Sequence, residues 1–388
     1  MKLIWPKALI LGFARIIPPV AKSQQPDAAL ANKIDSVFSA ATSADSPGLA
    51  AVVRKNGHIL FERGYGVRDL RTRARIDAQT NFRLASFTKQ FTAMAVMLLV
   101  KDGRLRYDQT LTEILSDFPD YGKLITIRNL LNHTSGLPDY EDLMEVLETS
   151  KGPLWSAEHQ IQDSEVLELL KKEKAGKFAS GTSWSYSNSG YVVLGLIVAK
   201  ISGQPYREFL QSRIFAPLKM NQTILFQKGK NKISNRAFGH SKENNALKET
   251  DQSPTSATLG DGGIYSNLED LYKWDTALRN HTLLSEKESQ QALLPVKLND
   301  GSQTYWPKEP GSDNLNPGKP VFYGFGWFLD PYKNHRRMGH PGSTLGFGTV
   351  IQRFPDDDLS IIILCNRTDI EPVNLSVQVA NILFSSKN

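Results

Sequence analysis

The sequence contains very little cysteine. Cys365 is the single cysteine among 388 residues, so an internal disulfide and a thiolate metal cluster are excluded. It stands in the stretch Ile-Ile-Ile-Leu-Cys-Asn, which is typical of a buried strand, and we expect a structural role for it. The seven histidines show no H-E-x-x-H or comparable spacing. The sequence therefore predicts neither a metal site nor a cofactor.

Basic runs and long apolar runs are also missing. The formal net charge is only +6, and no cluster of lysine and arginine stands out, so we expect no nucleic-acid partner. No segment reaches the apolar length of a membrane-spanning helix, so we expect no stable membrane span. A hydrophobic content of 40% with 22% charged residues is typical of a soluble globular protein, and the chain is long enough for a large core.

Residues 1–25 lack acidic side chains altogether. Lys2 and Lys7 precede a short apolar stretch, which Arg15 interrupts, and the first acidic residue is Asp27. This composition resembles a signal peptide and predicts an exported protein, periplasmic or secreted. The alternative is an N-terminal extension on a cytoplasmic protein, because the segment has no good small-x-small cleavage site.

Apolar periodicity places strands at both ends of the chain and helices in the middle. We expect an Asn56-Gly57 hairpin turn between strands at 49–53 and 59–61, and later strands at 321–328, 336–340, 346–354 and 359–365. We expect helices at 27–41, 86–102, 163–174, 191–201, 205–215, 268–278 and 372–383. Strands that flank a helical block indicate an α+β domain with a helical insertion.

The helix predicted from Ser86 onwards carries the first candidate site. Ser86 and Lys89 are three residues apart and therefore share one face of a helix. A lysine can accept the proton of a serine hydroxyl if its pKa is lowered, and the N-terminus of a helix favours a developing oxyanion. S-x-x-K is a short motif that occurs by chance, but this chain contains it only once.

A second candidate is Trp-Ser-Tyr-Ser-Asn-Ser-Gly at 184–190, directly before a very apolar helix. A turn of this composition can present the phenol of Tyr186 and the amide of Asn188 to a cleft. A tyrosine beside a lysine ammonium can act as a proton shuttle. The alternative is a loop tyrosine that simply packs on the core.

The third candidate is Gly-His-Pro-Gly-Ser-Thr at 339–344, at the end of a predicted strand. Gly342 would let a substrate backbone approach the strand, and the N–H of Ser343 would supply an oxyanion donor opposite Ser86. Pro341 cannot donate to a strand ladder, so we expect it at a sheet edge or a bulge. The alternative is an ordinary Pro-Gly turn.

Taken in order, these three motifs resemble those of the penicillin-recognising serine hydrolases. That superfamily includes class C β-lactamases, D,D-carboxypeptidases, D-aminopeptidases and β-lactamase-like esterases. Similar stretches occur at 133–138, 262–266 and 323–327, and the resemblance covers residues 28–385. It implies a mostly antiparallel sheet flanked by helices, with an inserted all-helical lobe. We expect the α/β part at about 28–85 and 260–388 and the lobe at about 106–258, in one hydrolase domain over 26–388.

The resemblance also implies a role for each site residue. Ser86 would be the acylated nucleophile and Lys89 its proton acceptor. Tyr186 would shuttle the proton to the leaving group and help to activate the deacylating water. Asn188 would orient the substrate, and the N–H groups of Ser86 and Ser343 would form the oxyanion hole.

The chain departs from the β-lactamase pattern at His340, which stands where those enzymes have the lysine of Lys-Thr-Gly. Histidine is mostly neutral at pH 7, and the proline that follows brings no hydroxyl. We therefore expect weak or no β-lactamase activity, and we favour esters or D-amino-acid peptides and amides as substrates. A D,D-carboxypeptidase or penicillin-binding protein, a weak class C-like β-lactamase and an inactive peptide-binding or scaffold relative stay open.

Substrate selection is expected to depend on residues 139–160 and 299–320. Trp155, Tyr305, Trp306 and Trp327 are candidates for an aromatic pocket, although simple packing is the alternative. The acyl group, the leaving group and the oligomeric state do not follow from the sequence.

Overall fold

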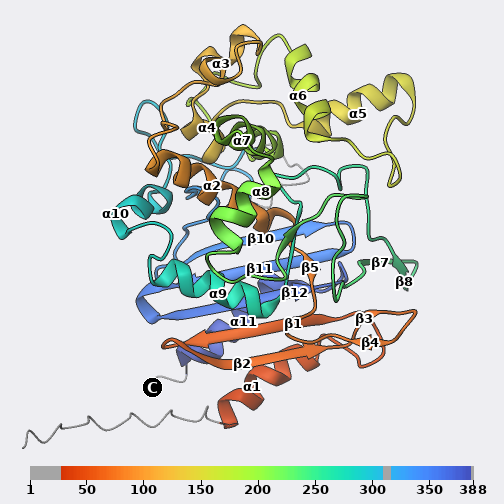
Figure 1. The fold of residues 1–388 in the computed structure, drawn as a ribbon. Helices are drawn as coiled ribbons and strands as arrows, with labels where there is room; N and C mark the ends of the chain where they lie inside the picture. The colour runs from red at the N-terminus through yellow and green to blue at the C-terminus, as the bar shows by residue number, and fades with distance from the viewer. Residues whose placement is uncertain (1–27, 309–315, 386–388) are drawn as a thin grey trace, which may run out of the picture.

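The computed structural model describes residues 28–308 and 316–385, so the predicted signal peptide lies outside the described residues. The largest sheet has five antiparallel strands in the order β10-β11-β12-β1-β2 (Figure 1). Its strands are β1 (Leu49–Lys55), β2 (His58–Tyr65), β10 (Met338–Thr344), β11 (Phe347–Phe354) and β12 (Leu359–Cys365). The chain thus brings its two ends together in one sheet, and the α+β class with an antiparallel sheet is confirmed.

The β1–β2 hairpin forms at the predicted turn. Asn56 and Gly57 both have positive φ angles, 52° and 79°, which is the backbone of the favoured two-residue hairpin turn. Lys55 then pairs with His58 across the turn.

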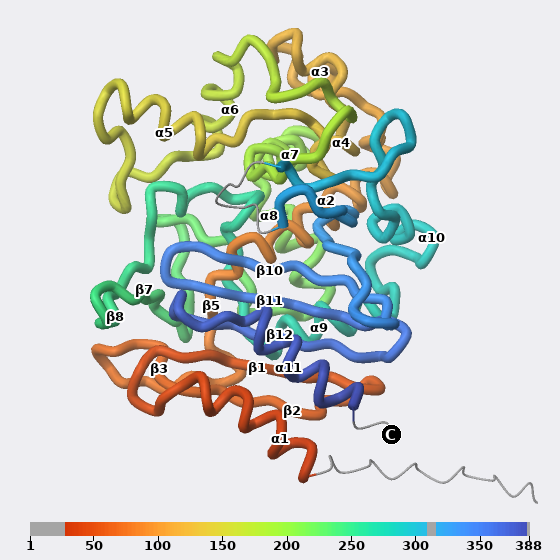
Figure 2. The backbone as a smooth tube through the Cα atoms, turned by 180° about the vertical axis from the view of Figure 1, so that it is seen from behind, coloured from red at the N-terminus to blue at the C-terminus, as the bar shows by residue number. Residues whose placement is uncertain are grey.

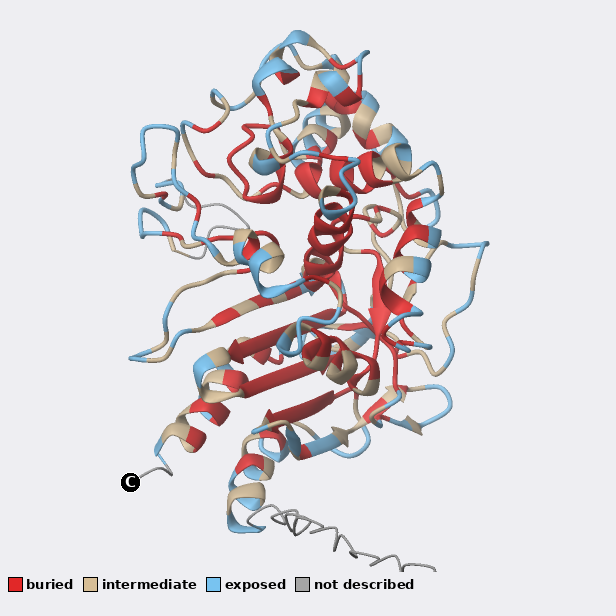
Figure 3. Cartoon of the chain, turned by 60° about the vertical axis from the view of Figure 1, so that its left-hand side comes forward, coloured by how far each residue is buried: buried red, intermediate tan, exposed pale blue. Residues whose placement is uncertain are grey.

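Both faces of this sheet are covered, because alternate residues of each strand point to opposite sides. In β1, Leu49, Ala51 and Val53 pack with helices α1 (Ala28–Ser39) and α11 (Pro372–Ser385). Figure 2 shows these two helices in front of the sheet. Ala50 and Val52 face the main core on the other side, and the central strands are accordingly buried (Figure 3). Cys365 is buried at the end of β12, where burial raises the pKa of its thiol.

A buried ion cluster joins the sheet to helix α9 (Leu268–Arg279). The carboxylate of Asp275 accepts from Arg54 of β1 and from Nε of Arg353 of β11, the latter at 2.6 Å. Burial alone would raise the pKa of Asp275, but the two guanidinium charges outweigh it and lower the pKa. The cluster fixes α9 against the face of the sheet that carries the main core.

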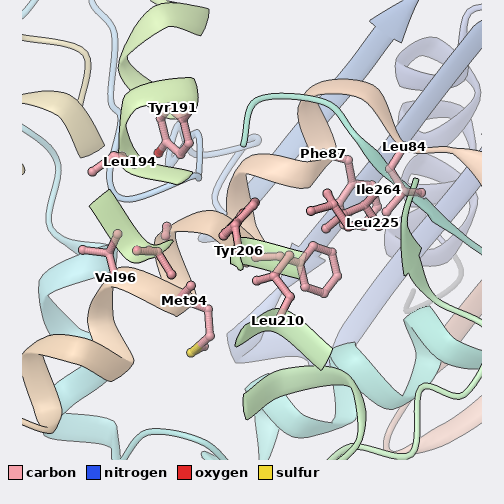
Figure 4. Close-up of a cluster of buried hydrophobic side chains, with 14 of the residues drawn as sticks. Leu84, Phe87, Met94, Val96, Tyr191, Leu194, Tyr206, Leu210, Leu225 and Ile264 are labelled. Atoms are coloured by element: carbon pink, nitrogen blue, oxygen red, sulfur yellow. The ribbon is translucent and has the colours of Figure 1, made fainter. Parts of the chain in front are cut away.

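The main core packs helix α2 (Lys89–Lys101) against helix α7 (Asn188–Ser202). Figure 4 shows Val96 of α2 on the side of Leu194 of α7, Met94 on another side of α2, and Leu84 and Phe87 with Ile264 further along the cluster. Leu84 is tied to Ile264 by a backbone hydrogen bond of 2.8 Å. This core therefore holds the segment around residue 86 in place.

Residues 106–258 contain helices and some short strands. The helices are α3 (Leu111–Ile114), α4 (Ile127–Leu131), α5 (Tyr140–Lys151), α6 (Asp163–Lys172), α7 and α8 (Tyr206–Leu210). The strands are β6 (Ile224–Leu225) and the hairpin β7 (His240–Glu243) with β8 (Ala246–Glu249). Strand β6 pairs with β9 (Ile264–Ser266), which also pairs with β5 (Phe82–Arg83). The remaining α-helix and β-strands of the described residues are α10 (Glu286–Ser289), β3 (Val67–Asp69) and β4 (Ala74–Arg75). The boundaries given above for an all-helical lobe stay a prediction.

The strand expected at 321–328 is wrong. Tyr323 and Phe328 face each other as an isolated bridge, and the segment between them turns back on itself. Gly326 has a φ of 76°, which glycine adopts without steric cost and which interrupts an extended strand. No helix in the described part of the chain is both long and apolar enough to cross a bilayer.

Candidate active site

The candidate nucleophile lies in a short 3₁₀ turn, Ala85–Thr88, that leads into α2. Ala85, the first residue of this turn, has a φ of 49°, and the α-helix begins at Lys89, three residues after the start that the periodicity suggested. The hydrogen bond between Leu84 and Ile264 anchors the chain immediately before this turn. Ser86 is thus partly exposed at a strand-to-helix junction, between two fixed elements.

Lys89 connects the first two sequence motifs. Its side chain is fully buried, and Nζ donates to Ser86 Oγ at 3.0 Å and to Asn188 Oδ1 at 2.8 Å. Nζ also donates to the backbone carbonyl of Asp261 at 3.2 Å. The structure therefore brings together Ser86, Lys89 and Asn188, which are far apart in the sequence.

Tyr186 of the second motif lies beside the Lys89 amine. The Nζ atom is 4.9 Å from the centre of the Tyr186 ring, and this side chain is partly exposed. Asn188 is already the first residue of α7, and Ser187 caps that helix by accepting from the N–H of Gly190 at 3.2 Å. The expected turn is therefore a helix N-terminus, which fixes Asn188 more firmly than a loop would.

His133 and Asp139 hold this turn, and we did not assign either of them to the site from the sequence. The N–H of Ser187 donates to His133 Nδ1 at 3.1 Å, and the N–H of Asn188 donates to Asp139 Oδ2 at 2.7 Å. The His133 ring also lies against Tyr186, with a centroid distance of 4.4 Å. Burial, with the nearby Lys89 charge, lowers the pKa of His133 well below its ordinary value, so its ring is neutral. In the sequence, residues 133–138 stood out only by their similarity to the family, and no spacing indicated a role for His133.

The third motif lies on β10, the edge strand of the five-stranded sheet, so the predicted edge position of Pro341 is confirmed. His340 is buried, and its Nε2 is 3.0 Å from the hydroxyl of Tyr323. Its ring centroid is 6.2 Å from that of Tyr186. Burial and the nearby Lys89 charge lower the pKa of His340 to about 3. This position of the site therefore carries no positive charge at neutral pH.

Gly342 packs against the nucleophile turn itself. A Cβ atom at this position would lie 2.1 Å from the carbonyl oxygen of Leu84 and 3.1 Å from the backbone nitrogen of Phe87. The close neighbour of Gly342 is thus the chain's own backbone, whereas the sequence suggested a substrate. Ser343 follows it with an exposed side chain, and its role as an oxyanion donor stays a prediction.

The four aromatic residues proposed for a pocket lie in different environments. Trp327 is buried in the main core, Trp155 packs at its border, and Tyr305 is exposed. Trp306, like Tyr186, packs against a small buried cluster that includes Trp184 and Tyr323. Among residues 28–308 and 316–385, no group of three or more His, Cys, Asp or Glu side chains is placed to hold a metal ion.

Comparison with known proteins identifies relatives over most of the chain. The family model described as beta-lactamase matches residues 31–378. Penicillin-binding protein 4* of Bacillus subtilis (strain 168) is 31% identical over 329 residues, which cover 81% of this chain and 67% of that protein.

Two solved structures share the fold. The octameric penicillin-binding protein homologue from Pyrococcus abyssi superposes with a TM-score of 0.75 at 24% identity, over 93% of this chain and 78% of that one. The D-amino acid amidase from Ochrobactrum anthropi SV3 gives the same TM-score and identity, over 93% of this chain and 100% of that one. At this level of identity, the two structures show the fold alone.

Proposed function

The chain belongs to the β-lactamase family and is a serine hydrolase of that family, and we propose that it hydrolyses esters and amides of D-amino acids, including short D-peptides. The observation that carries this proposal is the position of Lys89 Nζ, within hydrogen-bond distance of both Ser86 Oγ and Asn188 Oδ1. One buried amine thus contacts a candidate nucleophile and a candidate substrate-orienting amide.

In the proposed acylation step, Lys89 acts in its unprotonated form and accepts the hydroxyl proton of Ser86 while Oγ bonds to the substrate carbonyl carbon. The separation of 3.0 Å supports direct proton transfer between the two side chains. The oxyanion that forms accepts hydrogen bonds from the backbone N–H groups of Ser86 and Ser343. A tetrahedral intermediate results, with its proton held on Lys89.

In the second step, the bond from the carbonyl carbon to the leaving nitrogen or oxygen breaks. Tyr186 gives its phenolic proton to the leaving group and takes the proton held by Lys89. A water molecule then attacks the acyl-enzyme and passes a proton to the Ser86 oxygen through the same pair of groups. The products are a carboxylic acid, the protonated leaving group and the free enzyme.

The neutral state of His340 supports substrates without a carboxylate at this position. Both ring nitrogens are engaged inside the protein, Nε2 with the Tyr323 hydroxyl and Nδ1 beside the Pro341 carbonyl oxygen. An amide or an ester brings no negative charge to this position, whereas a peptide with a free C-terminus brings a carboxylate, which a cation would bind more strongly than a neutral ring does. One protein that shares the fold is, by its name, a D-amino acid amidase, and the proposal extends this substrate class to the present chain.

A cell-wall D,D-carboxypeptidase or penicillin-binding protein is the second candidate. It is favoured by the 31% identity to penicillin-binding protein 4*. The missing charge at His340 speaks against it. An inactive binding relative is the third candidate, and the close packing of Ser86, Lys89 and Tyr186 speaks against that.

The test is hydrolysis of four compounds: a p-nitrophenyl acyl ester, D-alanyl-p-nitroanilide, L-alanyl-p-nitroanilide and nitrocefin. We expect turnover of the ester and the D-anilide, and loss of about 10³-fold or more in Ser86→Ala and Lys89→Met. Lys101→Met, at the exposed end of the same helix, is the matched control and should keep full activity. Rapid nitrocefin hydrolysis, or no turnover of any compound, would overturn the proposal.

A further inference from the structure

Aromatic side chains form a continuous packed group beside Tyr186. Trp184 and Tyr323 are its buried centre, and Tyr186, Trp306 and Phe328 pack against them while staying partly exposed. A buried aromatic group is ordinary core packing. The three partly exposed rings differ from such a core. They join Tyr186, the proposed proton donor, to Trp306 and Phe328, which are far from it in sequence.

Ring contacts trace this continuity from the site outwards. The centroid of Tyr186 is 6.2 Å from that of His340, which is 5.2 Å from that of Phe328. Phe328 stacks on Trp306 with an interplanar angle of 11° and a centroid distance of 5.9 Å. Trp306 in turn meets the buried Trp184 edge-on at 4.8 Å. The Phe328–Trp306 pair is therefore connected to the site through His340 on one side and supported by the core on the other.

The backbone around Trp306 is fixed as well. Its N–H donates to the carbonyl of Lys319 at 2.9 Å, and the N–H of Gly318 donates to the carbonyl of Trp306 at 3.2 Å. A ring that is held in place before binding loses little conformational entropy when a ligand packs on it. The pair is thus a preformed apolar surface.

We propose that Trp306 and Phe328 bind the leaving group of the substrate and select aromatic or large apolar leaving groups over small ones. The inference rests on the function proposed above, in which Tyr186 protonates the leaving group. A leaving group that receives its proton from Tyr186 lies beside that ring, and the ring contacts lead from Tyr186 through His340 to Phe328 and Trp306. Uncharged rings and the neutral His340 suit an aryl amide, an aryl ester or an amide to an aromatic residue.

The test compares two substrates with one acyl group, D-alanyl-p-nitroanilide and D-alaninamide, whose leaving groups are p-nitroaniline and ammonia. In Trp306→Ala we expect kcat/KM for the anilide to fall about tenfold, with most of the change in KM, since one aromatic pair is lost. The amide should change less than twofold. Trp306→Phe should recover most of the anilide activity, and Tyr305→Ala, at an exposed aromatic neighbour, should match the wild type for both substrates.

Labelling of Ser86 by a fluorophosphonate separates the possible failures. Equal losses for both substrates in Trp306→Ala, or no change for either, would overturn the leaving-group inference while wild-type turnover and labelling keep the proposed function intact. If the wild type turns over neither substrate and Ser86 is not labelled, both proposals fall.

Discussion

Replacement of Gly342 by alanine tests how tightly β10 packs against the nucleophile turn. The added Cβ would lie 2.1 Å from the Leu84 carbonyl oxygen, whereas ordinary van der Waals contact begins at 3.4 Å. The contact therefore needs about 1.3 Å of relief; the Thr349 hydroxyl, 2.4 Å from the added Cβ, can rotate away, but the Leu84 carbonyl belongs to the backbone and cannot. The strand and the turn must move apart, which separates Ser343 from Ser86.

A misplacement of about 1 Å between reacting groups can reduce a rate about 10²-fold. We therefore expect Gly342→Ala to lower kcat/KM for D-alanyl-p-nitroanilide by about two orders of magnitude. The added methyl group should also lower the thermal stability, because it overpacks this contact, but only modestly, because the shift stays local to the edge strand. Steady-state kinetics and a thermal melt measure the two effects.

Gly348→Ala is the matched control, because Gly348 lies on the neighbouring strand β11. A Cβ there would meet the ring of Pro372 at 3.5 Å, which is an ordinary contact, so activity should stay within a factor of two of the wild type. Gly342→Ala with activity equal to that of Gly348→Ala would refute the argument, since the oxyanion geometry would then not depend on this close approach.

Three further predictions concern buried polar groups. Burial, with the nearby Asp261 charge, raises the pKa of Asp163 to about 8, so stability should fall between about pH 4 and pH 8, where the folded carboxyl keeps a proton that the unfolded one loses. Asp163→Asn should reduce the slope of the unfolding free energy against pH by at most about 1.4 kcal/mol per pH unit, measured by urea unfolding at pH 5 to 8. An unchanged slope would contradict this prediction. Asp275→Asn leaves Arg54 and Arg353 without their shared carboxylate and should cost about 3–5 kcal/mol in the same assay, a cost below 1 kcal/mol being the contrary result. His133→Phe removes the acceptor that fixes the turn after Tyr186 and should lower kcat about 10-fold to 100-fold, with a smaller change in KM. A loss of stability without any change in kcat would mean that His133 contributes packing alone.

Much of the fold could be predicted because its signals are local. The Asn56-Gly57 turn requires two positive φ angles, and few residue pairs supply them, so the sequence marks this hairpin clearly. The strand predicted at 321–328 failed because Gly326 and the bridge between Tyr323 and Phe328 fold the segment back. An alternating apolar pattern does not reveal such a bend.

The site was harder to predict than the elements that carry it. Ser86 and Lys89 are close in sequence, and their spacing indicated their contact. The hydrogen bond from the Ser187 N–H to His133 joins residues 54 positions apart, and no periodicity encodes it. Burial of His340 was likewise invisible, because one edge-strand histidine in a sequence does not show what packs on it. Export stays a prediction, since residues 1–27 are not described.

The central claim is that Ser86 becomes acylated, and peptide mass spectrometry of the quenched protein tests it most directly. The protein is mixed with a slowly hydrolysed D-alanine aryl ester, quenched in acid within seconds and digested. We expect the mass of one D-alanyl group on the peptide that contains Ser86, none in Ser86→Ala, and much less in Lys89→Met than in Lys101→Met. A wild-type protein that turns over the ester with no adduct on that peptide, or with an adduct at another serine, would contradict the account.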